Sequence, residues 1–265
     1  MKAFILCAGF GSRMGSLTKD KPKCLMQING KTLLERHLKN LKLAGIDEVI
    51  INLHHKTEAV EKYLIDNKFF EMQISVSKEI EIMGTGGALL KAKELIGTDP
   101  FLLISGDIYT NYSFVDLIKQ DWSENFNLSD REIAAHLLAI GYSDDFRLKD
   151  KNSDFYFINS NSKNNFGNYP QFIKPYDSSL GIEGFTYSGI SIINPLLIQD
   201  SSISAPIELW RDYLSGAASN NLVTGEIYLE NYKEEQFEQG IFININTQED
   251  VKKVESLLKV YGKTK

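Results

Sequence analysis

The sequence predicts an α/β fold of Rossmann-like type, in which helices sandwich a mainly parallel sheet and a smaller lobe is antiparallel. Strand-like apolar runs alternate with amphipathic helical segments up to about residue 112, and the pattern then turns polar, aromatic and Asn-rich. No linker-like stretch separates the two parts. We therefore expect one domain over residues 1–265, with a first half near 1–112 and a second half near 113–265.

The first half begins with a continuous apolar run over residues 2–8, which predicts a strand buried on both faces. Thr32 and Glu35 fit a capping box, leucines at helical spacing follow them, and Gly45 ends the predicted helix. Alternation of this kind favours parallel βαβ units. The other expected elements are strands at 47–53, 72–79 and 101–107 and helices at about 57–67 and 84–97.

The second half is less regular. Residues 150–177 are polar and Asn-rich with alternating aromatics, which predicts an antiparallel meander with a mobile loop. Pro206 marks the start of a helix, because proline is favoured at the first helical position. Thr247 is expected to cap the final helix. The other expected elements are strands at 131–141, 185–194 and 241–247 and a helix at 247–262.

Charge and cysteine content exclude several classes of protein. The net charge of −6 and the pI of about 5.4 provide no basic field, so we expect neither nucleic acid nor an anionic membrane as a partner. The two cysteines form no disulfide framework and have no zinc-ligand spacing, which favours reduced thiols in a cytoplasmic protein. The N-terminal apolar run is too short for a signal peptide or a membrane span.

The stretch LCAGFGSRMGSLTKDKPKCL, residues 6–25, begins at the end of the first expected strand and continues directly after it. Backbone N–H groups in that position can surround an anion, and Gly9 and Gly11 carry no Cβ atom to obstruct it. Arg13 and Lys23 add a bidentate guanidinium and a movable ammonium group. The stretch lacks the third glycine of a dinucleotide fingerprint and the Gly-Lys-Ser/Thr of a Walker A loop. A glycine-rich turn with surface charges is the alternative.

Asp107 follows the apolar segment FLLIS and Gly106. A carboxylate at the C-terminal end of a strand faces the crevice in which open α/β sheets bind ligands. Magnesium favours one or two carboxylates together with phosphate oxygens and water. We therefore expect Asp107 to hold Mg²⁺, and the alternative is an aspartate that merely forms a turn.

The stretch LCAGFGSRMGSLTKDKPK resembles the signature of the sugar-nucleotide nucleotidyltransferases, L-x-A-G-x-G-S/T-R-M/L-x-P-L-T-x3-P-K, with Ser16 at a usual proline position. GTGGAL resembles that family's base- and ribose-binding segment, FLLISGD its metal-binding strand end, and FTYSGISIINP its sugar-pocket strand. FININT stands where the family has W-V-D-V-G-T. Among subfamilies, the segments FLLISGDIYTNYSF, DDFRL and YSGISIINP are most similar to the N-acetylmuramate-1-phosphate uridylyltransferases.

This resemblance implies a magnesium-dependent enzyme of cell-wall (peptidoglycan) recycling that joins UTP and N-acetylmuramate-1-phosphate and releases pyrophosphate. Residues 1–112 would bind the nucleotide and residues 113–265 the sugar. Arg13 would stabilise the leaving pyrophosphate, and Lys23 would hold the nucleophile's phosphate or the α-phosphate. The implied nucleotide-binding residues are Ala8, Gly9, Gly11, Ser12, Arg13, Lys23, Gly84, Thr85 and Gly86; the sugar-binding residues are Ser105, Asp145, Ser188 and Gly189; the metal ligands are Asp107 and Asn244.

Two departures from the family pattern leave alternatives open. Asn244 stands in place of a second metal-binding aspartate and brings no charge, and Asn246 replaces the following glycine. Ser105 stands where the muramate type has asparagine. One alternative is a pyrophosphorylase for another sugar-1-phosphate, such as glucose-1-phosphate, or for a phospho-alcohol with CTP. Another is a catalytically weak regulator that binds sugar nucleotides.

Overall fold

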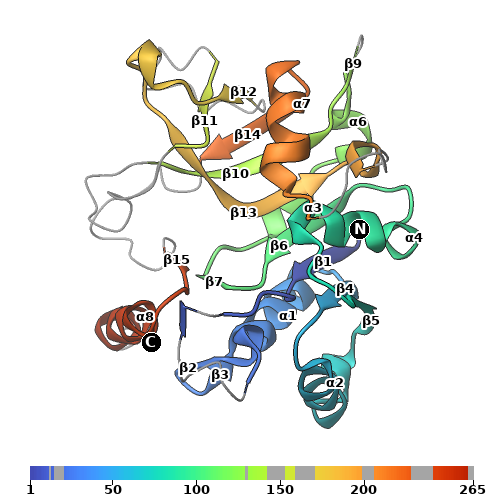
Figure 1. The fold of residues 1–265 in the computed structure, drawn as a ribbon, viewed down its shortest axis with the longest axis vertical. Coiled ribbons are helices and arrows are strands. Elements are labelled where there is room, and N and C mark those ends of the chain that lie inside the picture. Colours follow the sequence, from blue (N-terminus) through green and yellow to red (C-terminus); the bar gives the residue numbers. More distant parts are fainter. Residues whose placement is uncertain are drawn as a thin grey trace.

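The first half of the chain forms four parallel strands (Figure 1). They are β1 (Ala3–Leu6), β4 (Glu48–Leu53), β5 (Gln73–Lys78) and β6 (Phe101–Ser105). The computed structural model describes residues 1–11, 13–14, 21–128, 131–141, 153–158, 171–198, 206–227 and 241–261. Each strand lies inside the range expected from the sequence. Both faces of β1, β4 and β6 are covered, whereas β5 is the edge strand and is only partly buried.

The helices of the first half cover the two faces of these strands. They are α1 (Leu33–Leu43), α2 (Thr57–Asp66), α3 (Gly84–Lys91) and α4 (Lys93–Ile96). The capping box is confirmed, since Thr32 Oγ1 accepts a 2.9 Å hydrogen bond from the backbone N–H of Glu35. The predicted helix at 84–97 is divided in two at Ala92.

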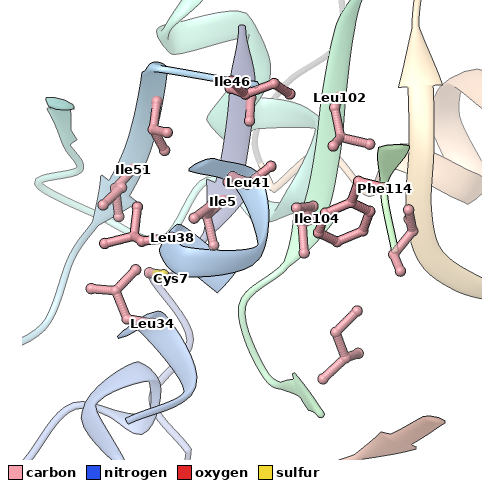
Figure 2. Close-up of a cluster of buried hydrophobic side chains, with 14 of the residues drawn as sticks. Ile5, Cys7, Leu34, Leu38, Leu41, Ile46, Ile51, Leu102, Ile104 and Phe114 are labelled. Atoms are coloured by element: carbon pink, nitrogen blue, oxygen red, sulfur yellow. The ribbon is translucent and has the colours of Figure 1, made fainter. Parts of the chain in front are cut away.

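Helix α1 is held on the sheet by its apolar side. Figure 2 shows Leu38 and Leu41 beside Ile5 of β1, and Leu34 beside Cys7 at the end of that strand. All three leucines are fully buried, and burial of each contributes about 2 kcal/mol. This packing fixes the carboxyl end of β1, from which the candidate phosphate loop starts.

The second half continues the same sheet. Its strands are β10 (Ala135–Gly141), β11 (Phe155–Phe157), β12 (Gln171–Pro175), β13 (Phe185–Ile193) and β14 (Val223–Ile227), in the nine-stranded order β10-β14-β12-β11-β13-β6-β1-β4-β5. Strand β13 runs antiparallel to β6 and pairs Ile190 with Ile104. Because β10 also pairs with β13, the five second-half strands close into a ring. The expected antiparallel lobe is therefore an extension of the sheet.

Two expectations for the second half need correction. The helix predicted to begin at Pro206 begins at Leu209, as a π-helical turn (Leu209–Leu214) followed by α7 (Ser215–Ser219). Ile207 is extended because its N–H donates to the carbonyl of Met83 at 2.8 Å. The strand expected at 131–141 is interrupted and becomes β9 (Arg131–Glu132) and β10. The mobile loop expected within 150–177 lies mostly outside the described residues.

The C-terminal segment returns to the N-terminal half. Strand β15 (Phe242–Asn244) pairs with β7 (Ile108–Thr110), and α8 (Gln248–Tyr261) lies beside β2 (Gln27–Ile28), which pairs with β3 (Lys31–Thr32) (Figure 1). Thr247 caps α8 as predicted, since its Oγ1 accepts from the N–H of Asp250 at 3.2 Å. The remaining described elements include α5 (Val115–Ile118), α6 (Trp122–Asn125) and β8 (Asn127–Leu128). Among the described helices, none has the length and apolarity of a membrane span.

Candidate functional site

A pocket of about 390 Å³ opens at the carboxyl ends of β1, β4, β5 and β6. Its floor is the loop at 7–11 that follows β1, and the side chain of Phe10 on this loop is 53% exposed. This is the edge at which open α/β sheets bind ligands. The pocket therefore lies where the sequence predicted a phosphate loop.

Four side chains join at one end of the pocket, and we call Arg13, Lys23, Asp107 and Asn246 the cationic end. Lys23 Nζ donates to Asp107 Oδ2 at 2.7 Å and to Asn246 Oδ1 at 3.0 Å. Arg13 Nη2 donates to the same amide oxygen at 2.9 Å. Both cations thus contact one neutral amide oxygen, and Lys23 also contacts a carboxylate. The N–H groups that these contacts leave over can donate to a polyanion.

Backbone packing fixes the positions of Asp107 and Lys23. The N–H of Gly106 donates to the carbonyl of Leu6 at 2.9 Å, which ties the turn before Asp107 to the end of β1. A Cβ atom on Gly106 would lie 2.5 Å from that carbonyl oxygen, so only glycine fits there. Lys23 begins a short 3₁₀ turn after Pro22 and is only 9% exposed, so its ammonium group is held inside the pocket.

A second group of polar side chains, Asn52, Glu79, Thr85 and Glu208, forms what we call the acidic end. Asn52 Nδ2 donates to Glu79 Oε1 at 2.7 Å, and the N–H of Met83 donates to Glu79 Oε2 at 3.1 Å. Thr85 Oγ1 donates to Glu208 Oε2 at 3.0 Å. Since β5 lies three strands from β6, Glu79 and Asp107 are separated by roughly 14 Å.

The glycine segment that begins at Gly84 packs directly against the backbone of Ile207. The N–H groups of Gly86 and Gly87 donate to the carbonyl of Ile207 at 2.8 and 3.2 Å. Gly84 has a φ of 78°, and a Cβ atom there would collide with the same carbonyl. The N–H of Gly86, which was expected to bind the base, is therefore used in a hydrogen bond within the protein, whereas Gly84 and Thr85 line the pocket.

Most of the predicted nucleotide-binding and catalytic residues line this one pocket. Ser12 and Asp145 lie outside the described residues. Gly86, Ser188, Gly189 and Asn244 are described but do not line the pocket. The predicted residues on the pocket lining are Ala8, Gly9, Gly11, Arg13, Lys23, Gly84, Thr85, Ser105 and Asp107.

The predicted sugar residues are arranged around Ser105. Gly189 of β13 has a φ of 81°, and a Cβ atom there would lie 2.5 Å from Ser105 Oγ. Ser188 Oγ is buried and accepts the N–H of Ile190 at 3.1 Å, so this hydroxyl supports the strand. Ser105 is the member of this group that faces the pocket.

Asn244 lies beside the strand that follows Asp107. It pairs with Ile108, and the N–H of Ile245 donates to the carbonyl of Asp107 at 2.8 Å. The Oδ1 atom of Asn244 is buried and accepts no hydrogen bond from the described residues. A hard-cation ligand set can use such an oxygen, because Mg²⁺ binds amide and carboxylate oxygens. Within the described ranges, no group of three or more His, Cys, Asp or Glu side chains is arranged so that it could hold a metal ion.

Two buried groups below the pocket have shifted pKa values. A hydrogen bond with Cys24 and burial raise the pKa of the Cys7 thiol, which keeps it protonated. Burial lowers the pKa of His37 to about 4, against the opposing effects of Asp107 and of a hydrogen bond to the backbone of Ile108. Both groups are therefore neutral near pH 7, and neither adds charge to the cationic end.

Several residues of the pocket lining had no site role predicted from the sequence, and five of them bear on its chemistry. Asn52 and Glu79 follow the rule used for Asp107, since each lies at or just after the carboxyl end of a parallel strand. No local signal marks Glu208, because it reaches the pocket only through contacts with the segment at 84–87. Phe10 and Asn246 were visible in the motifs but had no assigned role.

Comparison with known proteins agrees with this geometry. The family described as nucleotidyl transferase matches residues 2–130. N-acetylmuramate alpha-1-phosphate uridylyltransferase from Neisseria meningitidis serogroup B is 30% identical over 227 residues, which are 85% of this chain and 89% of that protein.

Other relatives match less of the chain or only its fold. A mannose-1-phosphate guanyltransferase from Neurospora crassa is 34% identical over 44% of this chain, and the match covers 33% of that protein's length. A UDP-glucose pyrophosphorylase structure from Acinetobacter baumanii superposes with a TM-score of 0.72 at 16% identity, covering 99% of this chain and 94% of that one. This likeness confirms the predicted nucleotide-diphospho-sugar transferase fold.

Proposed function

The chain belongs to the nucleotidyl transferase family, and on that premise we propose that it joins a nucleoside triphosphate to a sugar-1-phosphate. One observation carries the proposal: Arg13, Lys23 and Asp107 converge at one end of a pocket whose floor is a glycine-containing loop. We take UTP and N-acetylmuramate-1-phosphate as the first candidate pair. The relative with that activity matches most of the chain.

The reaction needs positioning and charge neutralisation rather than covalent catalysis. A phosphate oxygen of the sugar-1-phosphate forms a bond to the α-phosphorus, and the bond from that phosphorus to the bridging oxygen breaks. The electron pair leaves with pyrophosphate. Arg13 stabilises the charge on the leaving pyrophosphate, and Lys23 holds the phosphate under attack. The backbone N–H groups at residues 8–10 of the loop orient the triphosphate.

Asp107 and Asn244 are the residues that would hold Mg²⁺. The free oxygen of Asn244 and the carboxylate of Asp107, whose side chain is 32% exposed, fit a site that substrate phosphates complete. When bound, the ion supplies positive charge to the phosphates. Lys23 already neutralises one oxygen of Asp107, so the second oxygen is the one available to a cation.

A panel of nucleoside triphosphates and sugar-1-phosphates, read by pyrophosphate release, tests the proposal. UTP, GTP, CTP, dTTP and ATP are each paired with N-acetylmuramate-1-phosphate, glucose-1-phosphate and mannose-1-phosphate, with and without Mg²⁺. Turnover of at least one pair that stops without Mg²⁺ supports the transferase. Tight binding of a sugar nucleotide with no turnover supports the regulator instead.

A guanylyltransferase is the second candidate, because Glu79 favours guanine. Its carboxylate is 5% exposed on the pocket lining, and each oxygen accepts one hydrogen bond and keeps a further lone pair. Guanine offers two adjacent donors, N1–H and N2–H, which a carboxylate can accept together. Uracil offers only N3–H between two carbonyl oxygens, which a carboxylate repels. Higher kcat/KM with GTP than with UTP in the panel would select this candidate.

A further inference from the structure

Asn246 joins the two cations of the pocket to the C-terminal segment. Its Oδ1 atom accepts from Arg13 Nη2 at 2.9 Å and from Lys23 Nζ at 3.0 Å, across 233 and 223 residues of sequence. Lys23 also donates to Asp107 at 2.7 Å. One amide oxygen is therefore the common partner of both cations at the cationic end.

The backbone of Asn246 is fixed on both sides. Before it, the N–H of Ile245 donates to the carbonyl of Asp107 at 2.8 Å. After it, Asp250 Oδ2 accepts the N–H groups of Asn246 and Thr247, both at 2.8 Å, at the start of α8. The amide therefore belongs to a rigid helix start, whereas Arg13 is an exposed side chain on a loop.

Apolar packing adds a second connection between the same two segments. Met14 and Met26, on either side of Lys23, pack with Ile243 and Val254 in one buried cluster. The C-terminal segment therefore supports the loop both through side-chain burial and through the Asn246 amide. A long cation has about 2 kcal/mol of rotamer entropy, so holding it in place favours one geometry of the cationic end.

Asn246 can keep both contacts while phosphate binds. The ammonium of Lys23 has three donors, of which Asp107 and Asn246 use two. The guanidinium of Arg13 has five donors, and Asn246 uses one. Each cation thus retains N–H groups that can donate to a phosphate in the pocket.

We propose that Asn246 is a positioning residue that orients Arg13 and Lys23 toward the phosphates of the substrate, an inference that rests on the proposed function. It does not touch the reacting atoms and acts through the two cations. Because it belongs to the start of α8, the C-terminal segment becomes part of the active site.

The test is calorimetric titration of the full chain with inorganic pyrophosphate, without metal. We expect Asn246→Gly to weaken pyrophosphate binding about tenfold, since hydrogen bonds to charged groups have effects of that order. Asn246→Ala, which keeps ordinary backbone freedom, should give the same result. Gln248→Gly removes an exposed amide two residues later and should stay within about twofold of wild type. Thermal unfolding confirms that each variant is folded.

A double-mutant cycle distinguishes positioning from a general structural effect. In an Arg13→Ala background the effect of Asn246→Gly should shrink to about threefold, because only the contact with Lys23 is left to lose. An equal factor in both backgrounds, or wild-type binding by Asn246→Gly, would overturn the proposal. If no substrate pair turns over, the transferase proposal fails, but this cycle still decides the role of Asn246.

Discussion

The two ends of the pocket present opposite charges to a ligand. At the cationic end, Arg13 and Lys23 share one amide oxygen, and Lys23 also donates to the carboxylate of Asp107. At the acidic end, Glu79 and Glu208 are held by an amide, a hydroxyl and a backbone N–H. The difference teaches that a ligand carrying phosphates at one end and hydrogen-bond donors at the other would match the pocket in one orientation. A nucleoside triphosphate has that same polarity, with phosphates at one end and a base at the other.

Both ends arise from one feature of the sheet. Asp107, Asn52 and Glu79 each lie at or near the carboxyl end of a parallel strand, where open α/β sheets leave a crevice. Charge at each end then depends on what the rest of the chain adds. The loop after β1 adds the cations, and the segment before α7 adds Glu208.

The largest expected effect is loss of the cationic end through Lys23→Ala. We expect turnover of the best substrate pair to fall by about a hundredfold or more, since a preorganised charge donor is removed. Lys21→Ala removes an exposed lysine two residues earlier and should leave turnover unchanged. Steady-state pyrophosphate release measures both variants, and near-normal turnover in Lys23→Ala would refute its assignment.

The next effect concerns the acidic end and the choice of base. Glu79→Gln replaces a carboxylate, which accepts hydrogen bonds at both oxygens, by an amide, which accepts at one atom and donates at the other. The amide cannot accept both guanine N–H groups, so the ratio of kcat/KM for GTP to that for UTP should fall about tenfold. Glu81→Gln changes an exposed carboxylate nearby and serves as the matched control. The same ratio in Glu79→Gln and wild type would remove Glu79 from base selection.

The third prediction concerns the pH dependence of the free energy of unfolding, to which the buried His37 contributes. The pKa of His37 is about 4 in the folded chain, below the 6.5 of a free histidine. Between these values the unfolded chain binds a proton that the native chain does not, so stability falls as pH drops from about 6.5 to about 4. This group contributes a slope of about 1.4 kcal/mol per pH unit. His136, whose pKa is lowered by burial to about 3, adds to the slope.

Denaturant unfolding at several pH values measures that slope. His37→Asn should reduce it by about 1.4 kcal/mol per pH unit. An unchanged slope in His37→Asn would show that this ring titrates alike in both states.

The smallest expected effect is on stability at the acidic end. Thr85 Oγ1 accepts the N–H of Leu209 at 2.8 Å and donates to Glu208, so Thr85→Val leaves both partners without this contact. We expect the free energy of unfolding to fall by about 1 kcal/mol. Thr98→Val, at an exposed position, is the control for the same chemical change. A loss no larger than that of the control would show that the Thr85 contacts are replaced by water.

The first half was predictable because its signals are local. The apolar runs, the capping box at Thr32 and the glycines after β1 each fix a conformation through neighbouring residues. The helix start at Pro206 was misplaced because Ile207 pairs with Met83, a contact that no local preference records. The arrangement of the second-half strands as a closed ring also depends on pairings between distant segments.

For the candidate site, the sequence alone predicted that Arg13, Lys23 and Asp107 lie together, and the structure brings them to one pocket. A glycine loop after a buried strand and a carboxylate at a strand end have fixed places in a parallel sheet. Only the tertiary structure decided their partner, because Asn246 reaches them across more than 200 residues. It likewise turned the N–H of Gly86 toward Ile207 and brought Glu208 to Thr85. Side chains that meet through the packing of distant segments have no recognisable spacing in the sequence, whereas side chains placed at the end of a strand follow a local pattern.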